Sequence, residues 1–272
     1  PDKSVGVIAV DGKTLRRSFD TASGKAAIHV ISAWSCEQKL VLGQRKVDDK
    51  SNEITAIPEL LALLSIEGAI ITIDAMGCQR TICQQIIAQK ADYVIGLKGN
   101  QGSLREDVEL FFDELRERGI ADGFIKQNQT VDGDHGRIEM RKHTVIEHVD
   151  WLNQHHKWPG LKSVSMVEYS REIKGKTKTV RRYYISSLNV EPAKMADYIR
   201  NHWQIENNLH WVMDMTYRQD ECRIRTGNAA ANFATIKHAA NNLLQKAPGK
   251  KSLPMKRQSA AWDDDYLENI IR

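Results

Sequence analysis

Ala69-Ile-Ile-Thr-Ile-Asp74 is an almost wholly apolar run that stops at a carboxylate. A short apolar run rich in β-branched residues is typical of a buried strand. A helical pattern follows over residues 80–90, and Ala91-Asp-Tyr-Val-Ile-Gly-Leu97 is the next expected strand. Strands that alternate with helices in this way predict a sheet covered by helices.

Three further runs rich in β-branched residues precede this segment, and turn residues separate them. They cover residues 5–10, 27–34 and 40–47. Leucines then predict a helix over 56–65, entered through Pro58 in its first turn. Ser103, with Glu106 three residues on, has the spacing of a capping box that opens a long helix over 103–118. An antiparallel meander followed by alternating strands and helices predicts an α/β fold with a mixed sheet flanked by helices.

The chain changes character after residue 118. Short hydrophobic runs separated by Gly and charge predict a mostly β insert at 119–190, and helical patterns return after it. We therefore expect four parts: 1–118 as the first part of a core, 119–190 as the β-rich insert, 191–245 as its helical completion, and 246–272 as a loosely held C-terminal tail.

The composition is that of an ordinary globular protein, with 41% hydrophobic and 27% charged residues among 272. It excludes a disordered or collagen-like chain. No apolar run approaches the ~20 residues of a membrane span, so we expect no membrane partner and a cytoplasmic location. Because the chain starts at Pro1 with strand-like sequence close behind, we expect it to be a piece of something longer. The formal net charge of +4 points only weakly toward polyanions.

Cysteine and histidine spacings argue against zinc. None of the four cysteines forms a C-x-x-C pair, so the sequence predicts neither a disulfide framework nor a zinc knuckle. Five histidines lie between residues 135 and 156, but none of their spacings matches the ligand pairs of helical or finger sites. The sequence therefore predicts no zinc site among them.

Two carboxylates follow predicted strands: Asp11 after the first and Asp74 after the fourth. If these strands are neighbours, both side chains emerge at one sheet edge, where divalent cations such as Mg²⁺ would offset their repulsion. Glu206, on a predicted helix, is a candidate third ligand for a two-metal site. Plainer interpretations stay open: Asp11-Gly12 as a hairpin turn, Asp74 as a helix cap, and Glu206 as a solvated helix residue.

Four segments resemble one protein family: Ala9-Val-Asp-Gly-Lys13, Ile73-Asp-Ala-Met-Gly-Cys-Gln79, Leu97-Lys-Gly-Asn-Gln101 and His202-Trp-Gln-Ile-Glu-Asn-Asn-Leu-His-Trp211. They are similar to the DDE transposases of bacterial insertion sequences, specifically the H-repeat-associated proteins found near Rhs elements. The resemblance covers nearly the whole chain. It implies a ribonuclease-H-like fold, interrupted by a β insert before the helix that bears the catalytic glutamate.

The resemblance also implies a chemistry. The catalytic triad would be Asp11, Asp74 and Glu206, which would bind Mg²⁺, or Mn²⁺ as a substitute, for DNA cleavage and strand transfer at element ends. Two copies on paired double-stranded ends are expected, as is association with the nucleoid. The chain departs from a Tyr-x-x-Arg signature that many relatives carry around the glutamate, because Ile199 and His202 occupy those two positions.

Basic residues suggest where a polyanion such as DNA would lie. Residues 171–182 hold six basic residues and one acidic residue around a glycine, as on a hairpin that tracks phosphates or on a solvated edge hairpin. The residues that we expect to contact DNA are Lys13, Lys98, Asn100, Arg200, His202, Lys174, Lys176 and Lys178. A polar turn is the alternative for 98–101, and a charged strand for Lys13.

Three functions remain open from sequence. The first is a DDE transposase, the second a catalytically silent DNA-binding remnant of one, and the third a ribonuclease-H-fold nuclease that does not join strands. Salt-sensitive DNA binding without cleavage would favour the second. Cleavage without transfer of a 3′-hydroxyl end to a second duplex would favour the third.

Overall fold

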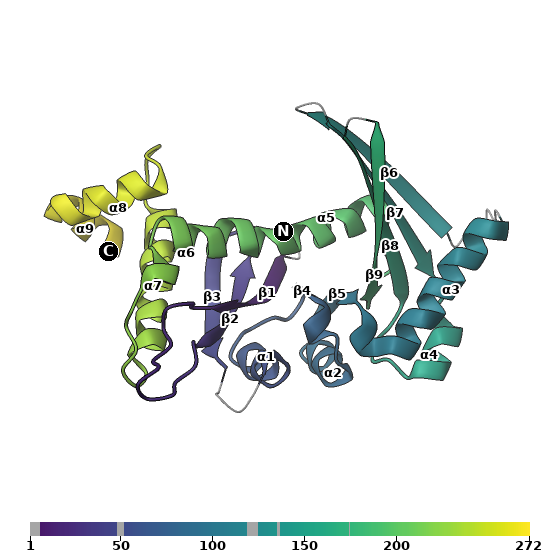
Figure 1. The fold of residues 1–272 in the computed structure, drawn as a ribbon, viewed down its shortest axis with the longest axis horizontal. Helices are drawn as coiled ribbons and strands as arrows, with labels where there is room; N and C mark the ends of the chain where they lie inside the picture. Colours follow the sequence, from purple (N-terminus) through teal and green to yellow (C-terminus); the bar gives the residue numbers. More distant parts are fainter. Residues whose placement is uncertain (1–5, 48–51, 119–124, 135–136, 174) are drawn as a thin grey trace. The chain divides into compact units, whose positions relative to one another are not determined.

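The computed structural model describes residues 6–47, 52–118, 125–134, 137–173 and 175–272 (Figure 1). The chain divides into two compact units. Unit 1 comprises residues 1–7 and 66–201, and unit 2 comprises residues 8–65 and 202–272. Each unit combines strands with helices, which confirms the predicted α/β class.

Unit 2 contains three antiparallel strands: β1 (Val7–Thr14), whose first residue belongs to unit 1, β2 (His29–Ser35) and β3 (Leu40–Lys46). Helix α1 (Glu53–Ala62) contacts β2 and β3, and α7 (Ala229–Lys246) contacts β3. The central strand β2 is buried over six of its seven residues, as its apolar sequence predicts.

The first strand is longer than its sequence predicts. Asp11 pairs with Ser32 and Gly12 pairs with Ile31, so both lie inside β1. The interpretation of Asp11-Gly12 as a hairpin turn is therefore wrong, and so is an end of the strand at residue 10. Pairing with β2 overrides the local turn propensity of Asp-Gly, and the backbone amide of Leu15 still donates to Ile28 at 2.9 Å.

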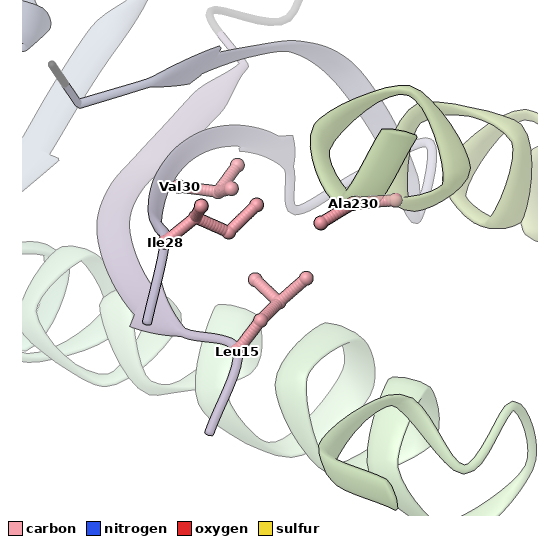
Figure 2. Close-up of a cluster of buried hydrophobic side chains, with 5 residues drawn as sticks. Leu15, Ile28, Val30 and Ala230 are labelled. Carbon is pink, nitrogen blue, oxygen red and sulfur yellow. The ribbon is translucent and has the colours of Figure 1, made fainter. Parts of the chain in front are cut away.

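A small apolar cluster lies at the C-terminal end of β1 (Figure 2). It consists of Leu15, Ile28, Val30, Ala230 and Ala234, each at most 6% exposed. Leu15 directly follows β1, Ile28 directly precedes β2, Val30 lies in β2, and the two alanines lie in α7. The cluster therefore joins the strands to a helix that lies about 200 positions later in the chain.

We expect Leu15→Ala to lower the free energy of unfolding of unit 2 by about 2–4 kcal/mol, because truncation removes buried methyl groups and leaves a cavity. Urea unfolding followed by circular dichroism measures the change. The control is Leu63→Ala, since Leu63 is 70% exposed. If both variants lose the same stability, the cluster does not hold α7 to the strands.

Unit 1 contains a mixed set of strands. Strand β4 (Ile70–Ile73) runs parallel to β5 (Asp92–Leu97), with α2 (Arg80–Ala88) between them in the chain, as predicted. The amide of Ile70 donates to the Gly6 carbonyl at 3.0 Å, so the residue just before β1 lies beside β4.

Four antiparallel strands continue unit 1 beyond β5, in the order β9 (Lys176–Ser186), β8 (Ser163–Ile173), β7 (Arg137–Glu147) and β6 (Ile125–Asp134). Together with α4 (Asp150–His156), they occupy the stretch for which a mostly β insert is predicted. Helix α3 (Gly102–Arg118) contacts β9 and α4.

Two helix starts differ from their prediction. Helix α1 begins at Glu53, where the Asn52 side chain caps it by accepting from the amide of Ile54, so Pro58 lies in the second turn. Helix α3 begins at Gly102 after a 3-10 turn, η2 (Gly99–Gln101), so Ser103 is inside the helix and the capping box is wrong. At α1, Asn52, which lies upstream of the expected start, satisfies part of the helix terminus.

The C-terminal part is helical throughout most of its length. Its elements are α5 (Pro192–Gln204), a π-helix η3 (Ile205–His210), α6 (Trp211–Met215), η4 (Gln219–Glu221), α7, α8 (Leu253–Trp262) and α9 (Asp264–Ile271). The stretch 246–272, expected as a loose tail, forms two helices that contact α7. The buried Lys256 ammonium ties α8 to α7 by donating to the Leu244 carbonyl at 3.3 Å. Within the described ranges, no helix is both long and apolar enough to cross a membrane.

We expect unit 2 to lose stability in acid. Burial lowers the pKa of His238 on α7 from 6.5 to about 4, so the folded state keeps this ring neutral where the unfolded chain binds a proton. The free energy of unfolding therefore falls as the pH drops from 6.5 toward 4. Between about pH 7.5 and about pH 5 this group contributes a loss of about 2 kcal/mol.

The variant His238→Gln tests how much of the acid-dependent loss of unfolding free energy comes from His238, because glutamine does not titrate. Urea unfolding at both pH values should show a loss smaller by about 2 kcal/mol in the variant than in the wild type. Equal losses in the two proteins would show that His238 does not carry the acid sensitivity.

Candidate active site

Asp74 lies directly after β4 and starts a short 3-10 turn, η1 (Ala75–Gly77), in unit 1. Its Oδ1 accepts a hydrogen bond from the Met76 amide at 2.8 Å. The interpretation of Asp74 as a cap is thus correct for this turn, whereas α2 has Gln79 as its N-cap. Since the cap needs only one carboxylate oxygen, capping and cation binding are compatible roles.

The turn that presents Asp74 is held by the segment after β5. The side-chain amide Nδ2 of Asn100 donates to the Ala75 carbonyl at 2.7 Å, and the side-chain Nε2 of Gln101 donates to the Cys78 carbonyl at 2.8 Å. Gly96 leaves the room for this approach, because a Cβ there would lie 3.2 Å from the Ala75 nitrogen. Asn100, expected to contact DNA, therefore positions the backbone next to Asp74, as its polar-turn alternative implies. Lys98 is exposed.

Asp11 lies in unit 2 at the middle of β1, with 21% of its side chain exposed. Its Oδ2 is 3.5 Å from Nδ1 of His210. Burial, and then the charge of Lys13, lower the pKa of His210 to about 3. The ring is therefore neutral near pH 7, and the contact is one between a carboxylate and a neutral imidazole.

Glu206 lies in the π-helix η3, which the sequence does not predict. Ile205 and Leu209 are fully buried and fix this segment, while the Glu206 side chain is exposed. Because His210 at the end of η3 contacts Asp11, the segment that carries Glu206 lies beside β1. π-Helical turns inside α-helices are frequent at functional sites. Asn207 and Asn208, which are poor helix formers, are the sequence signal for the irregularity.

Lys13 is surrounded by carboxylates. Its Nζ is 2.6 Å from Oδ2 of Asp214 and 3.5 Å from Oδ1 of Asp220, and its side chain is only 15% exposed. Arg16 Nε adds a contact of 3.2 Å to Asp220. In this arrangement the charge of Lys13 offsets protein carboxylates, so a phosphate would have to compete with Asp214 for it.

The other residues expected to contact DNA lie on several elements. Arg200 is exposed on α5, and His202 is half-buried near the end of the same helix. Lys176 and Lys178 are exposed at the start of β9. Lys174 lies outside the described residues.

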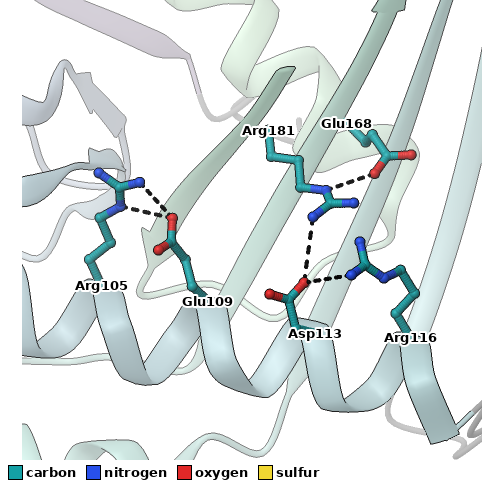
Figure 3. A network of polar contacts seen from close by, with 6 residues as sticks. All are labelled: Arg105, Glu109, Asp113, Arg116, Glu168 and Arg181. Atoms are coloured by element: carbon teal, nitrogen blue, oxygen red, sulfur yellow. Dashed lines mark hydrogen bonds and ion pairs between the residues drawn. The ribbon is translucent and has the colours of Figure 1, made fainter. Parts of the chain in front are cut away.

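Part of the basic run at 171–182 is engaged with α3 (Figure 3). Arg181 donates to Glu168 at 2.9 Å through Nε and to Asp113 at 3.5 Å through Nη1. Arg116 joins the network at 3.3 Å from Asp113, and Arg105 pairs with Glu109 on the same helix. Arg181 thus attaches β9 to α3, which leaves the exposed lysines near the hairpin end as the candidates for phosphate contacts.

Comparison with known proteins identifies the family of this chain. The family model described as "Transposase DDE domain" matches residues 4–243, which include all three candidate carboxylates. The chain belongs to the DDE transposase family. Its α/β fold is thus the ribonuclease-H-like fold of these transposases, as the sequence resemblance implies.

Several relatives from Escherichia coli align with nearly the whole chain. YbfL of strain K12 is 45% identical over 97% of this chain and 71% of its own length. YhhI of strain K12, named as an H repeat-associated candidate transposase, is 44% identical over the same shares. YncI of O157:H7, also named as a candidate transposase, is 42% identical over 97% of this chain and 68% of its own length. The name of YhhI agrees with the H-repeat resemblance.

Proposed function

We propose that this DDE transposase cleaves DNA at the ends of an insertion element and joins the resulting 3′ ends to target DNA. Asp11, Asp74 and Glu206 are its proposed metal ligands. The observation that carries the proposal is the contact between His210 and Asp11, because it sets the π-helix with Glu206 beside the strand with Asp11. Asp74 follows a buried strand on a turn that Asn100 holds in place.

The donor set suits a hard cation. Asp11 and Asp74 are half-buried carboxylates, and Glu206 is an exposed one. Carboxylate oxygens are the protein ligands that Mg²⁺ prefers, and Mn²⁺ accepts the same oxygens. A bound pair of such ions would supply an activated water or 3′-hydroxyl and stabilise the leaving oxygen. The chain's own part is to hold the ligands in position and to bind the DNA backbone.

We propose that Lys98, Arg200, Lys176 and Lys178 contact phosphates of double-stranded DNA, since all four are exposed. From the sequence, we assign Lys174 and His202 to the same proposed DNA surface. Two copies acting on paired element ends would follow the family pattern.

The double variant Lys176→Ala/Lys178→Ala should weaken DNA binding by a similar factor on every sequence. Each lost phosphate contact lowers the slope of log affinity against log salt by about 0.9, so the double variant should lose about 1.8. Fluorescence anisotropy between about 50 and about 200 mM salt measures this slope.

The matched control is Lys246→Ala/Lys250→Ala, which removes the same charge from exposed positions outside the hairpin. An unchanged slope in the hairpin variant, or an equal loss in the control, would remove β9 from the DNA surface.

The activity itself is tested on a plasmid that carries the DNA flanking the coding region. The proposal predicts nicks that require Mg²⁺ or Mn²⁺, followed by joining of the 3′ ends to a second duplex. Salt-sensitive binding without nicks in either metal would contradict the proposal and support the silent remnant. Nicks that are never joined would support a nuclease.

A further inference from the structure

A cluster of metal-ligating side chains lies between α3 and α4 in unit 1. It consists of Asp107 on α3, and of His155 and His156 at the end of α4. Oδ2 of Asp107 is 2.8 Å from Nε2 of His156. One possible ligand atom from each residue lies within 4.8 Å of the other two. The three residues come from two helices, which explains why spacing within the histidine-rich segment gives no zinc signal.

The burial of the three side chains is graded. His156 is 5% exposed, Asp107 is 38% exposed, and His155 is exposed to solvent. The two imidazole rings meet edge to face, with centroids 4.7 Å apart. The buried histidine and the aspartate are thus already fixed to each other, while the third side chain can rotate toward them at little cost.

We propose that Asp107, His155 and His156 bind Zn²⁺ and that the ion links α3 to α4. Two imidazole nitrogens and one carboxylate form a set that zinc accepts, with water in the fourth position. Bonds of about 2.0–2.2 Å place the ligand atoms of a zinc ion roughly 3.2–3.6 Å apart. Oδ2 of Asp107 and Nε2 of His156, now 2.8 Å apart, would move slightly apart to admit the ion, and the exposed ring of His155 would move in from at most 4.8 Å.

The end of α4 also favours a cation here. The histidines occupy the last turn of α4, where unpaired carbonyls give the helix terminus a partial negative charge. The helix stops at Lys157, whose left-handed backbone, with φ of 50°, ends the helical hydrogen bonding. Mg²⁺ prefers all-oxygen ligands, so it would compete weakly with zinc for two imidazoles.

The alternative is a plain hydrogen bond between His156 and Asp107 that ties the helices without any ion. That bond needs only those two residues and gives His155 no role. His155 therefore distinguishes the two cases. Because its side chain is exposed, its replacement does not open a cavity.

The test uses the full chain, stripped of metal by a chelator and dialysed against Zn²⁺ in excess Mg²⁺. His155→Asn is compared with His148→Asn, which removes an exposed imidazole elsewhere in unit 1. Asparagine suits position 148, where φ is 59°, because it tolerates the left-handed region. Calorimetric titration gives the affinity, and elemental analysis gives the zinc content per chain.

We expect the wild type and His148→Asn to retain one zinc ion more per chain than His155→Asn, or to bind it at least ten-fold more tightly. Zinc should also raise the melting temperature of the first two proteins but not of the third. Equal zinc content together with equal affinity in all three, loss in both variants, or no zinc on the wild type would each overturn the proposal. These results do not depend on whether the chain cleaves DNA.

Discussion

Asp74→Asn should abolish metal-dependent nicking, with a loss on the order of a thousand-fold or more, while the fold stays intact. The amide is neutral and is a poor ligand for Mg²⁺, so the replacement removes the charge that would hold the ion. It keeps the structural role, because an asparagine oxygen can accept from the Met76 amide just as Oδ1 of Asp74 does. Plasmid nicking in Mg²⁺ and in Mn²⁺ measures the effect.

The stability of this variant separates chemistry from folding. Its free energy of unfolding should stay within about 0.5 kcal/mol of the wild type, since the turn keeps its cap. The control is Asp132→Asn on β6, where the carboxylate pairs with Arg141 at 2.7 Å and is exposed. Normal nicking by Asp74→Asn would remove Asp74 from the mechanism. A loss of the same size in Asp132→Asn would show that the assay reports general damage.

Glu206→Gln should cost on the order of a hundred- to a thousand-fold in nicking, because it exchanges a proposed carboxylate ligand for an amide of the same shape. The Glu206 side chain is exposed on η3, so the free energy of unfolding should not change. DNA binding should persist, and it should be slightly tighter in the absence of metal because a negative charge near the phosphates is lost. Nicking and anisotropy on the same preparation give both values.

Glu221→Gln is the matched control for this variant. Glu221 is an exposed glutamate in unit 2, and it pairs with Arg218 at 2.6 Å. The Glu221→Gln protein should nick DNA like the wild type. If the Glu206→Gln protein nicks DNA normally, Glu206 is a solvated helix residue, which is the alternative that the sequence leaves open.

The strands and helices follow from sequence where local pattern and tertiary packing agree. Residues 70–73 of the run 69–74 form β4, and the strand-helix-strand order gives the parallel pair of β4 and β5. Local pattern fails at β1, where pairing with β2 extends the strand through Asp11 and Gly12. The register of distant strands decides that extension, and no local propensity encodes it.

The candidate site is predictable in its residue types and less so in its geometry. Asp11 and Asp74 are proposed from their places after predicted strands, Glu206 is proposed from a predicted helix, and the resemblance implies all three as the triad. The π-helix and the contact between His210 and Asp11 depend on how helix and strand pack within unit 2. The pairing of Lys13 with Asp214 joins residues that are about 200 positions apart, so sequence gave no sign that its charge was already engaged.

Iron-directed cleavage of the polypeptide tests the proposed metal site most directly. Fe²⁺ bound in place of Mg²⁺, with ascorbate and peroxide, produces hydroxyl radicals that cut the nearby main chain. The experiment uses His155→Asn, so that iron at the Asp107 cluster adds no cuts. We predict three sets of fragments, ending close to Asp11, Asp74 and Glu206, all suppressed by excess Mg²⁺ and by Asp74→Asn. Cuts near only one of these residues, or cuts that Asp74→Asn leaves unchanged, would contradict a metal site shared by the three carboxylates.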